Sequence, residues 1–528
     1  MATLLDITET IRLEEQALLR GGGKSGTDRQ RKLGRLPVRE RLAVLLDQDR
    51  PFLELGLWAA HRMYPDWGSV PAAGVITGLG WISGQPCMIA ANDATVKAGA
   101  MFPQSVKKLI RAQQIAHRLR VPIVYLMDSA GVFLPLQDEI FPDEDDFGRI
   151  FRNNSILSAD GIPQYAAVMG NCIAGGAYLP VLCDKILMTE GSQLCLAGPA
   201  LVKAAIGQTA DPEELGGARM HSAISGTVDF YEKDDESCLA RLRSLIAMLP
   251  DRPMQKIGCD PARDPKDAFN IVSADGRGEY DVRDLLICIV DAGSFQEFRP
   301  DYARTLVTGY ALINGVSVGI VANQRCRTKT SQGELQIGGV LYGDAAEKAA
   351  RFVRDCNQTR ISLVFFQDVQ GFMVGKQAEQ SGIIRSGAEF VYAMSVATVP
   401  KFTVIVGSSY GAGNYAMCGR AYDPSLMLAW PNARCAVMGG NQAADTMLTL
   451  RMREAEKSGR PLSPDAINQL RETIRQQYEE QTDIRYAAAR GWVDAIIPPN
   501  DTRLWLSAAL SVVPQTALAA RPSTAREI

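Results

Sequence analysis

The amino-acid sequence contains an internal duplication, and any fold for it must accommodate two similar units. A glycine-rich stretch occurs twice, as GNCIAGGAY at 170–178 and as GSSYGAGNY at 407–415. Three matched positions share a spacing of 237 residues (407 − 170, 413 − 176 and 415 − 178). Each copy follows an apolar run that is typical of a strand, 165–169 or 402–406. The pattern therefore predicts two units in which a buried strand runs into a tight glycine turn.

Other segments repeat in the same order. FLEL at 52–55 is similar to FQEF at 295–298. The apolar runs at 123–126 and 363–366 are followed by Asp128 and Asp368, for which we expect turn or helix-capping roles. Short apolar runs alternate with longer helical patterns in both halves. This alternation predicts an α/β fold with strands covered on both faces.

The chain is too long for one ordinary core, because 528 residues exceed the usual size of a domain. Residues 1–48 are predicted to form a helical arm, with Leu4, Ile7, Ile11 and Leu18 on one face. A linker is expected where prolines cluster, at positions 250, 253, 261 and 265. We therefore predict domains at 49–260 and 261–528, with a loose end after about residue 513.

Composition excludes several classes of function. A net charge of −3 gives no reason to expect a nucleic-acid or acidic-membrane partner, and no apolar run is long enough to span a bilayer. The start of the chain lacks the basic and apolar regions of a secretory signal. The eleven cysteines form no Cys-x-x-Cys pair, and the three histidines lie far apart. We therefore expect no metal site, and reduced thiols in a compartment like the cytoplasm.

The glycine-rich stretches suggest a chemistry. A strand that runs into small residues can direct backbone N–H groups outward and lets a ligand approach the main chain closely. Such amides stabilise negative charge on an oxygen atom, so two copies indicate a reaction with two developing oxyanions. The alternative is that these glycines only permit a tight turn.

Several longer motifs carry a family resemblance. They are FGRIF at 147–151, GPALVK at 198–203, GRAY at 419–422, WPNAR at 430–434 and MGG at 438–440. With the duplication, they resemble the carboxyltransferase (β) subunits of biotin-dependent acyl-CoA carboxylases. The resemblance is strongest to the 3-methylcrotonyl-CoA carboxylase branch of leucine degradation. It implies two tandem crotonase-like (ββα superhelix) domains and transfer of a carboxyl group from carboxybiotin to an acyl-CoA.

Alternatives to this function stay open. Within the family they are geranyl-CoA, propionyl-CoA and acetyl-CoA carboxylases and a biotin-dependent decarboxylase. A crotonase-type hydratase or thioesterase needs only one glycine turn, so it leaves the second copy unexplained. A scaffold subunit without activity would not need intact glycine stretches in both halves.

The resemblance also implies roles for individual residues. Gly175 and Gly176 would hold the enolate oxygen of the acyl-CoA thioester, and Ala412 and Gly413 the ureido oxygen of biotin. No side-chain base is required, because decarboxylated biotin can itself take the substrate proton. The other residues expected to line the site are Ala174, Tyr178, Tyr410, Gly411, Tyr415, Phe372 and Lys97.

Some of these residues also have a plain structural interpretation. Tyr410 would close the floor of the acyl pocket, which favours a short branched acyl chain over a geranyl chain. Tyr178 and Tyr415 could instead pack in the core, and Phe372 could lie beside biotin or in the core. Lys97 begins a basic stretch that continues with Lys107, Lys108 and Arg111. This stretch could meet the phosphates of CoA, but a solvated helix face is the default.

What the sequence lacks predicts its partners. It has no Met-Lys-Met biotinylation site and no glycine-rich phosphate loop with lysine. Biotin is therefore expected on a separate α subunit, with biotin carboxylase and biotin carrier domains that use ATP and bicarbonate. By resemblance the chain forms a homo-hexamer, a trimer of dimers, with each site between the first half of one subunit and the second half of its neighbour. The expected location is the bacterial cytoplasm, or the mitochondrial matrix if the protein is eukaryotic and a presequence has been removed.

Overall fold

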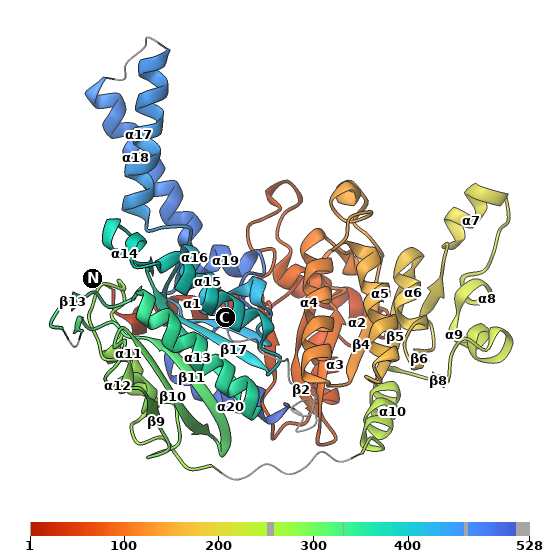
Figure 1. Ribbon diagram of the computed structural model, residues 1–528. Helices are drawn as coiled ribbons and strands as arrows, with labels where there is room; N and C mark the ends of the chain where they lie inside the picture. Colours follow the sequence, from red (N-terminus) through yellow and green to blue (C-terminus); the bar gives the residue numbers. More distant parts are fainter. Residues whose placement is uncertain (1, 251–257, 331, 459–462, 514–528) are drawn as a thin grey trace.

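A computed structural model describes residues 2–250, 258–330, 332–458 and 463–513. It contains two large mixed sheets, one in each half of the chain, with helices packed around them (Figure 1). Pro253 of the predicted linker and the predicted loose end after residue 513 lie outside the described residues. The predicted domain limits at 48 and 260 stay predictions.

The first sheet has the order β1-β2-β3-β4-β5-β6-β8, with β7 beside β5. Its strands are β1 (Leu53–Leu55), β2 (Val75–Ile82), β3 (Gln85–Asn92), β4 (Ile123–Ser129), β5 (Gln164–Ile173), β6 (Lys185–Thr189), β7 (Gln193–Cys195) and β8 (Phe230–Glu232). The β1–β2 and β2–β3 pairs are antiparallel, whereas the later neighbours are parallel.

The second sheet repeats this plan in the order β9-β10-β11-β15-β17-β18-β20, with β19 beside β17. Its strands are β9 (Gln296–Phe298), β10 (Leu306–Ile313), β11 (Val316–Asn323), β15 (Ser362–Val369), β17 (Lys401–Tyr410), β18 (Leu426–Ala429), β19 (Arg434–Ala436) and β20 (Ala495–Ile496). Four short strands form two further pairs: β12 (Thr328–Lys329) with β13 (Leu335–Gln336), and β14 (Val340–Leu341) with β16 (Gly371–Phe372). The two sheets share one strand order and one pattern of directions.

Helices cover the sheets and connect their parallel strands. Those of the first half are α4 (Pro103–Leu119), α5 (Phe147–Ala159), α6 (Tyr178–Val181), α7 (Pro199–Ile206), α8 (Pro212–Gly216), α9 (Ala218–Met220) and α10 (Asp235–Ala247). Those of the second half are α11 (Ala268–Ile271), α12 (Val282–Leu286), α13 (Gly343–Thr359), α14 (Lys376–Gln380), α15 (Ile383–Val396), α16 (Gly411–Ala416), α17 (Gly440–Lys457), α18 (Pro464–Thr482), α19 (Ile484–Ala489) and α20 (Thr502–Ser511). The central strands β4 and β17 are buried along their whole length, which explains their continuous apolar runs.

The N-terminal arm lies against both halves. It consists of α1 (Leu4–Leu18), α2 (Gly23–Lys32) and α3 (Val38–Leu45). Ile11 of α1 packs in a cluster with residues of the second half, whereas Leu42 of α3 packs against the first half. Helix α2 was not predicted, because its sequence is polar and rich in glycine. It forms where Gly26 lies so close to Thr95 that a Cβ atom would come within 2.6 Å of the Thr95 carbonyl oxygen.

A buried contact of the arm should make stability depend on pH. Burial raises the pKa of Glu15 to about 7, although the Trp58 indole donates to its carboxylate at 2.9 Å. Because the unfolded chain ionises this group near pH 4.5, stability should fall as the pH rises from about 4.5 to 7. We expect Glu15→Gln, which keeps an acceptor for Trp58, to stabilise the protein by about 1–2 kcal/mol at pH 8 and not at pH 4.5. Denaturant unfolding at both pH values measures this, and an equal gain at both would contradict it.

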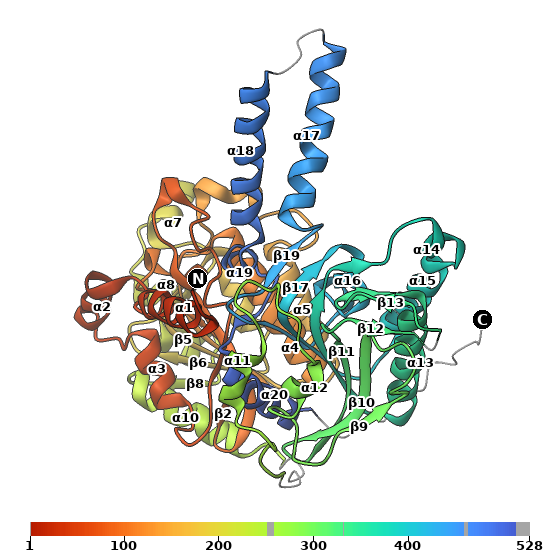
Figure 2. The same ribbon diagram turned by 90° about the vertical axis from the view of Figure 1, so that its left-hand side faces the viewer.

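Two segments project from the body. The hairpin of α17 and α18 extends far beyond the sheets in both views, and α7 projects beside the first sheet (Figures 1 and 2). They occupy corresponding places in the two halves, since α7 follows β7 and α17 follows β19. Of the helices that the structure describes, none has both the length and the apolar character needed to cross a membrane.

Candidate active site

Each glycine-rich stretch forms a turn at the end of a central strand. After β5 the chain enters a short 3₁₀ turn, Ala174–Ala177, and after β17 it enters α16. The first residue of each turn has a positive φ, 60° at Ala174 and 53° at Gly411. These positions are equivalent in the duplication (411 − 174 = 237). The sequence does not reveal that Ala174 is left-handed, a conformation that is strained for a residue with a Cβ atom.

The turns place backbone donors at the start of helical segments. In the part of the chain that the structure describes, no side chain and no backbone carbonyl outside the helices and strands accepts a hydrogen bond from the N–H groups of Gly175, Gly176, Ala412 or Gly413. Both sets lie in the first turn of a helical segment, where N–H groups lack a partner within the helix or have a poorly aligned one. Each turn can therefore offer adjacent amides to a negatively charged oxygen.

The glycines differ in the space around them. At Gly176, which is itself buried, an added Cβ atom would meet no other atom within 4 Å, so there is free space beside the turn. At Gly413 it would come within 2.5 Å of Val369 Cγ2. At Gly170 and Gly407 it would collide with the carboxylates of Asp128 and Asp368.

The aromatic residues predicted for the site differ in exposure. Tyr178 and Tyr415 are each 51% exposed beside their turns, so core packing is the wrong interpretation of them. Tyr410 is buried beneath the second turn, and burial raises the pKa of its hydroxyl. Phe372 is partly buried and packs against the second core, with its ring 3.2 Å from where a Cβ atom of Gly387 would lie.

Only part of the basic stretch is solvated. Lys97 and Lys107 are exposed, but Lys108 and Arg111 are buried, so a solvated helix face is wrong for the latter two. Lys108 donates to the Ala72 carbonyl at 3.0 Å, and burial lowers its pKa to about 7. Neither buried side chain has a surface position from which to meet a CoA phosphate.

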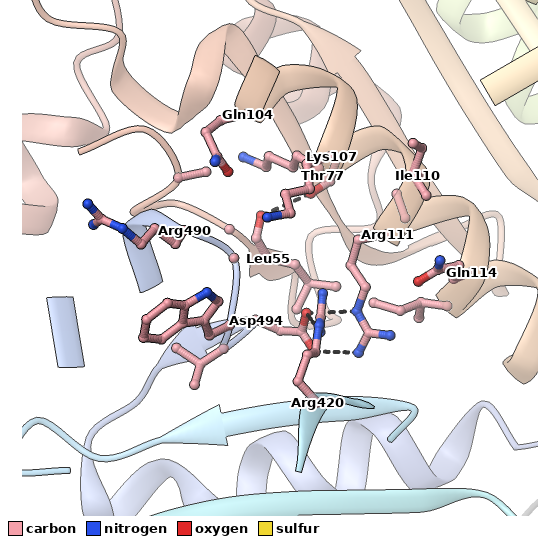
Figure 3. Close-up of a pocket in the computed structure, with 18 of the residues that line it drawn as sticks. Leu55, Thr77, Gln104, Lys107, Ile110, Arg111, Gln114, Arg420, Arg490 and Asp494 are labelled. Atoms are coloured by element: carbon pink, nitrogen blue, oxygen red, sulfur yellow. Dashed lines mark hydrogen bonds and ion pairs between the residues drawn. The ribbon is translucent and has the colours of Figure 1, made fainter. Parts of the chain in front are cut away.

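Arg111 is instead part of an ion-pair cluster that joins the two halves. Its guanidinium makes two hydrogen bonds to Asp494, at 2.9 and 2.7 Å, and Arg420 makes a third at 2.8 Å. The cluster lies beside a cavity of about 290 Å³, lined by α4 and by the segment that precedes β20 (Figure 3). Lys107, Lys108 and Arg111 of the basic stretch line this cavity, whereas none of the residues predicted for the two glycine turns does. Sequence reasoning missed the cluster because its members come from distant segments.

The two turns of one chain do not face each other. In Figure 1, α6 follows the first turn and lies on the right, whereas α16 contains the second turn and lies on the left. Exposed apolar side chains occur in both halves, and two of them directly follow β7 and β19. Those of the first half are Leu134, Phe141, Leu196, Leu201, Ile206 and Ile224, and those of the second are Val374, Ile384, Val437, Met447 and Leu450.

Comparison with known proteins identifies the family. The family model of the carboxyl transferase domain matches residues 29–528. The biotin-dependent 3-methylcrotonyl-coenzyme A carboxylase beta1 subunit of Mycobacterium tuberculosis is 45% identical over 497 residues, which cover 93% of this chain and 91% of that protein. The mitochondrial methylcrotonoyl-CoA carboxylase beta chain of Arabidopsis thaliana is 42% identical over 520 residues, covering 96% and 86%.

A solved structure agrees with these sequence matches. The β subunit of geranyl-CoA carboxylase from P. aeruginosa superposes with a TM-score of 0.87 at 34% identity, covering 99% of this chain and 95% of that one. The chain belongs to the carboxyltransferase β subunits of the biotin-dependent acyl-CoA carboxylases. The predicted fold of two tandem crotonase-like domains is confirmed.

Proposed function

We propose that this enzyme carboxylates 3-methylcrotonyl-CoA, with carboxybiotin supplied by a partner chain. The observation that carries the proposal is the pair of glycine turns, each of which places adjacent amides in the first turn of a helical segment. The acyl specificity is supported by the two relatives named for 3-methylcrotonyl-CoA. It is further supported by the bulky ring of Tyr410 beneath the second turn, which favours a short branched acyl chain.

Each turn would stabilise negative charge on a different oxygen atom. The amides of Gly175 and Gly176 would donate hydrogen bonds to the thioester oxygen, which gains charge when the substrate loses its proton. The open space beside Gly176 suits an acyl group that approaches the main chain. The amides of Ala412 and Gly413 would donate to the ureido oxygen of biotin. Bound carboxybiotin supplies the carboxyl group, and the amides supply fixed dipoles at both oxygens without reorganisation.

The other predicted residues would border the substrates. Ala174 and Gly411 set the direction of the turns, and Tyr178 and Tyr415 stand at their rims. Phe372 would flank biotin. Lys97 and Lys107 are the exposed cations of the basic stretch, so they would be the members placed to meet CoA.

The complete site would need a second copy of the chain. Because the turns of one chain lie apart, the first turn of one copy would face the second turn of its neighbour. Exposed apolar side chains in both halves, such as Leu196 after β7 and Val437 after β19, support an interface between copies. The assembly we propose is a hexamer made as a trimer of dimers. A biotin-carrying α subunit would deliver carboxybiotin and use ATP and bicarbonate, in the bacterial cytoplasm or the mitochondrial matrix.

Geranyl-CoA is the second candidate substrate, because the solved structure with a TM-score of 0.87 is a geranyl-CoA carboxylase subunit. Incorporation of labelled bicarbonate into a panel of acyl-CoAs, by the chain assembled with its biotin-bearing subunit, separates the two. We expect the highest kcat/KM with 3-methylcrotonyl-CoA, and a gain for geranyl-CoA in Tyr410→Ala. A preference of the unmutated protein for geranyl-CoA would contradict the specificity. No incorporation into any acyl-CoA would contradict the function.

A further inference from the structure

A backbone irregularity precedes each glycine turn and is built in the same way in both halves. The pairing of β4 with β5 shifts register between Met127 and Ser129, and that of β15 with β17 shifts between Gln367 and Val369. Asp128 and Asp368 lie at these two shifts. Both are buried, with 3% and 1% of their surfaces exposed.

Each carboxylate binds the strand that leads to its turn. Asp128 Oδ1 accepts the N–H of Asn171 at 3.3 Å, and Asp368 Oδ1 accepts the N–H of Ser408 at 2.8 Å. The donor positions correspond, since 408 − 171 = 237. Neither carboxylate caps a helix that the structure describes, so the helix-capping alternative is wrong, whereas the turn alternative is not contradicted. The glycines at 170 and 407 are required because only a residue without a side chain leaves room for the carboxylate.

The backbone carbonyl groups that precede these glycines also accept hydrogen bonds from side chains in both halves. Arg41 donates to the Met169 carbonyl at 3.0 Å, and Asn432 donates to the Val406 carbonyl at 3.3 Å. Met169 and Val406 are again equivalent (406 − 169 = 237). A bulge leaves ladder groups unpaired, so these side chains fix a backbone segment that the sheet does not hold.

The counter-ions differ between the halves. Asp128 pairs with two residues of the N-terminal arm, Arg41 at 3.4 Å and Arg35 at 3.6 Å. Asp368 pairs with Arg325 at 3.1 Å and accepts the Tyr280 hydroxyl at 3.1 Å. The N-terminal arm therefore supplies the counter-ions of Asp128 beside the first turn. The partners of Asp368 come from the second half itself.

We propose that Asp128 and Asp368 are positioning residues, each of which sets the direction of the amides in its own glycine turn. Only a few residues separate each braced amide from the donor amides, 171 from 175 and 408 from 412. When the carboxylate no longer holds the amide of Asn171 or Ser408, the irregular segment relaxes. The donor amides of the turn then move away from the oxygen atom that they stabilise. The inference rests on the proposed roles of the two turns. Displacement by about 1 Å is enough to lower a rate about a hundredfold.

Two partial reactions distinguish the contribution of the first turn from that of the second turn. Decarboxylation of the carboxylated acyl-CoA breaks a C–C bond, releases CO2 and leaves an enolate that takes a proton from water, so it uses the first turn. Decarboxylation of carboxybiotin on the α subunit breaks an N–C bond, releases CO2 and places charge on the ureido group, which then takes a proton. It uses the second turn.

We expect a crossed pattern in the assembled enzyme. Asp128→Asn should slow the first partial reaction by about tenfold to a hundredfold and leave the second within about twofold. Asp368→Asn should do the reverse. If Asp128→Asn or Asp368→Asn folds poorly, milder variants should show the same pattern more weakly. These are Arg35→Gln for the first half and Tyr280→Phe, which removes one hydroxyl group, for the second half.

The chain offers matched controls. Asp47 and Asp291 are also equivalent carboxylates that accept hairpin-turn amides at 2.7–3.0 Å, and they pair with Arg243 and Arg503. Their Asn variants should lower the melting temperature without favouring either partial reaction. The proposal would be overturned, in an experiment where the unmutated enzyme is active, by either of two results. One is an equal loss of rate in both partial reactions for Asp128→Asn or Asp368→Asn. The other is a loss of the same size in the control variants. Absence of both reactions in the unmutated enzyme would instead contradict the proposed function and with it this inference.

Discussion

Gly176→Pro is expected to lower kcat for carboxyl transfer by about 10²–10³-fold, which corresponds to about 2.7–4 kcal/mol of lost transition-state stabilisation. Proline removes the N–H group and leaves the rest of the main chain in place. Space is available, since nothing lies within 4 Å of where a Cβ atom would stand at this position. The preceding residue, Gly175, tolerates the backbone restriction that proline imposes. Steady-state carboxylation with the α subunit, together with a melting curve, measures both effects.

Gly176→Ala is the matched control, because it keeps the donor. We expect it to retain most of kcat and to raise KM, since its methyl group enters the open space beside the turn. Should Gly176→Pro fold normally and keep the kcat of the unmutated enzyme, the first turn would not stabilise the oxyanion.

Asp494→Asn is expected to lower the free energy of unfolding by about 3–5 kcal/mol. Asp494 is buried and accepts hydrogen bonds from Arg111, Arg420 and the N–H of Met427. Without its charge, the buried Arg111 and the partly buried Arg420 lose the carboxylate that compensates them between the halves. Burial alone would raise the pKa of Asp494, but Arg111 and Arg420 lower it below the ordinary value of 3.8. The carboxylate is therefore ionised throughout pH 5–8, and the deficit of the variant should be constant across this range.

Asp423→Asn provides the comparison. Asp423 forms an ion pair with Arg118 in the same region, but 70% of its side chain is exposed. Its loss should cost less than about 1 kcal/mol. Denaturant unfolding of both variants tests the difference, and equal effects would show that the buried cluster contributes no more than a surface ion pair.

The duplication made much of the fold predictable. Spacing within the sequence located both glycine turns and the strands that precede them, because these features depend on local residue order. The exposed position of Tyr178 was not predictable, since an aromatic residue after a turn fits a core equally well in sequence. The buried state of Arg111 was missed for a related reason. Its carboxylate partner lies 383 residues away, and charge in a helical pattern normally indicates solvent.

The cations that pair with the carboxylates beside the turns could not be predicted from the sequence either. Asp128 and Asp368 were recognised as equivalent, but their partners follow no repeat: Arg41 lies in the arm, whereas Arg325 lies in the second half. Tertiary packing, rather than any local pattern, determines which cation reaches each carboxylate. The strain at Ala174 has the same origin, because the turn geometry is imposed on a residue that does not favour it.

The central claim is that two amide turns from different copies of the chain face each other across one site. Co-expression of Gly176→Pro subunits with Ala412→Pro subunits tests it most directly, since each variant removes one donor from one turn. Each variant alone should have about 1% of normal activity or less. In random mixed dimers, half of the pairs contain both variants and one of their two sites is intact, so the mixture should recover about a quarter of normal activity. Activity no higher than the mean of the two variants would show that both turns of a site belong to one chain, and would contradict the account.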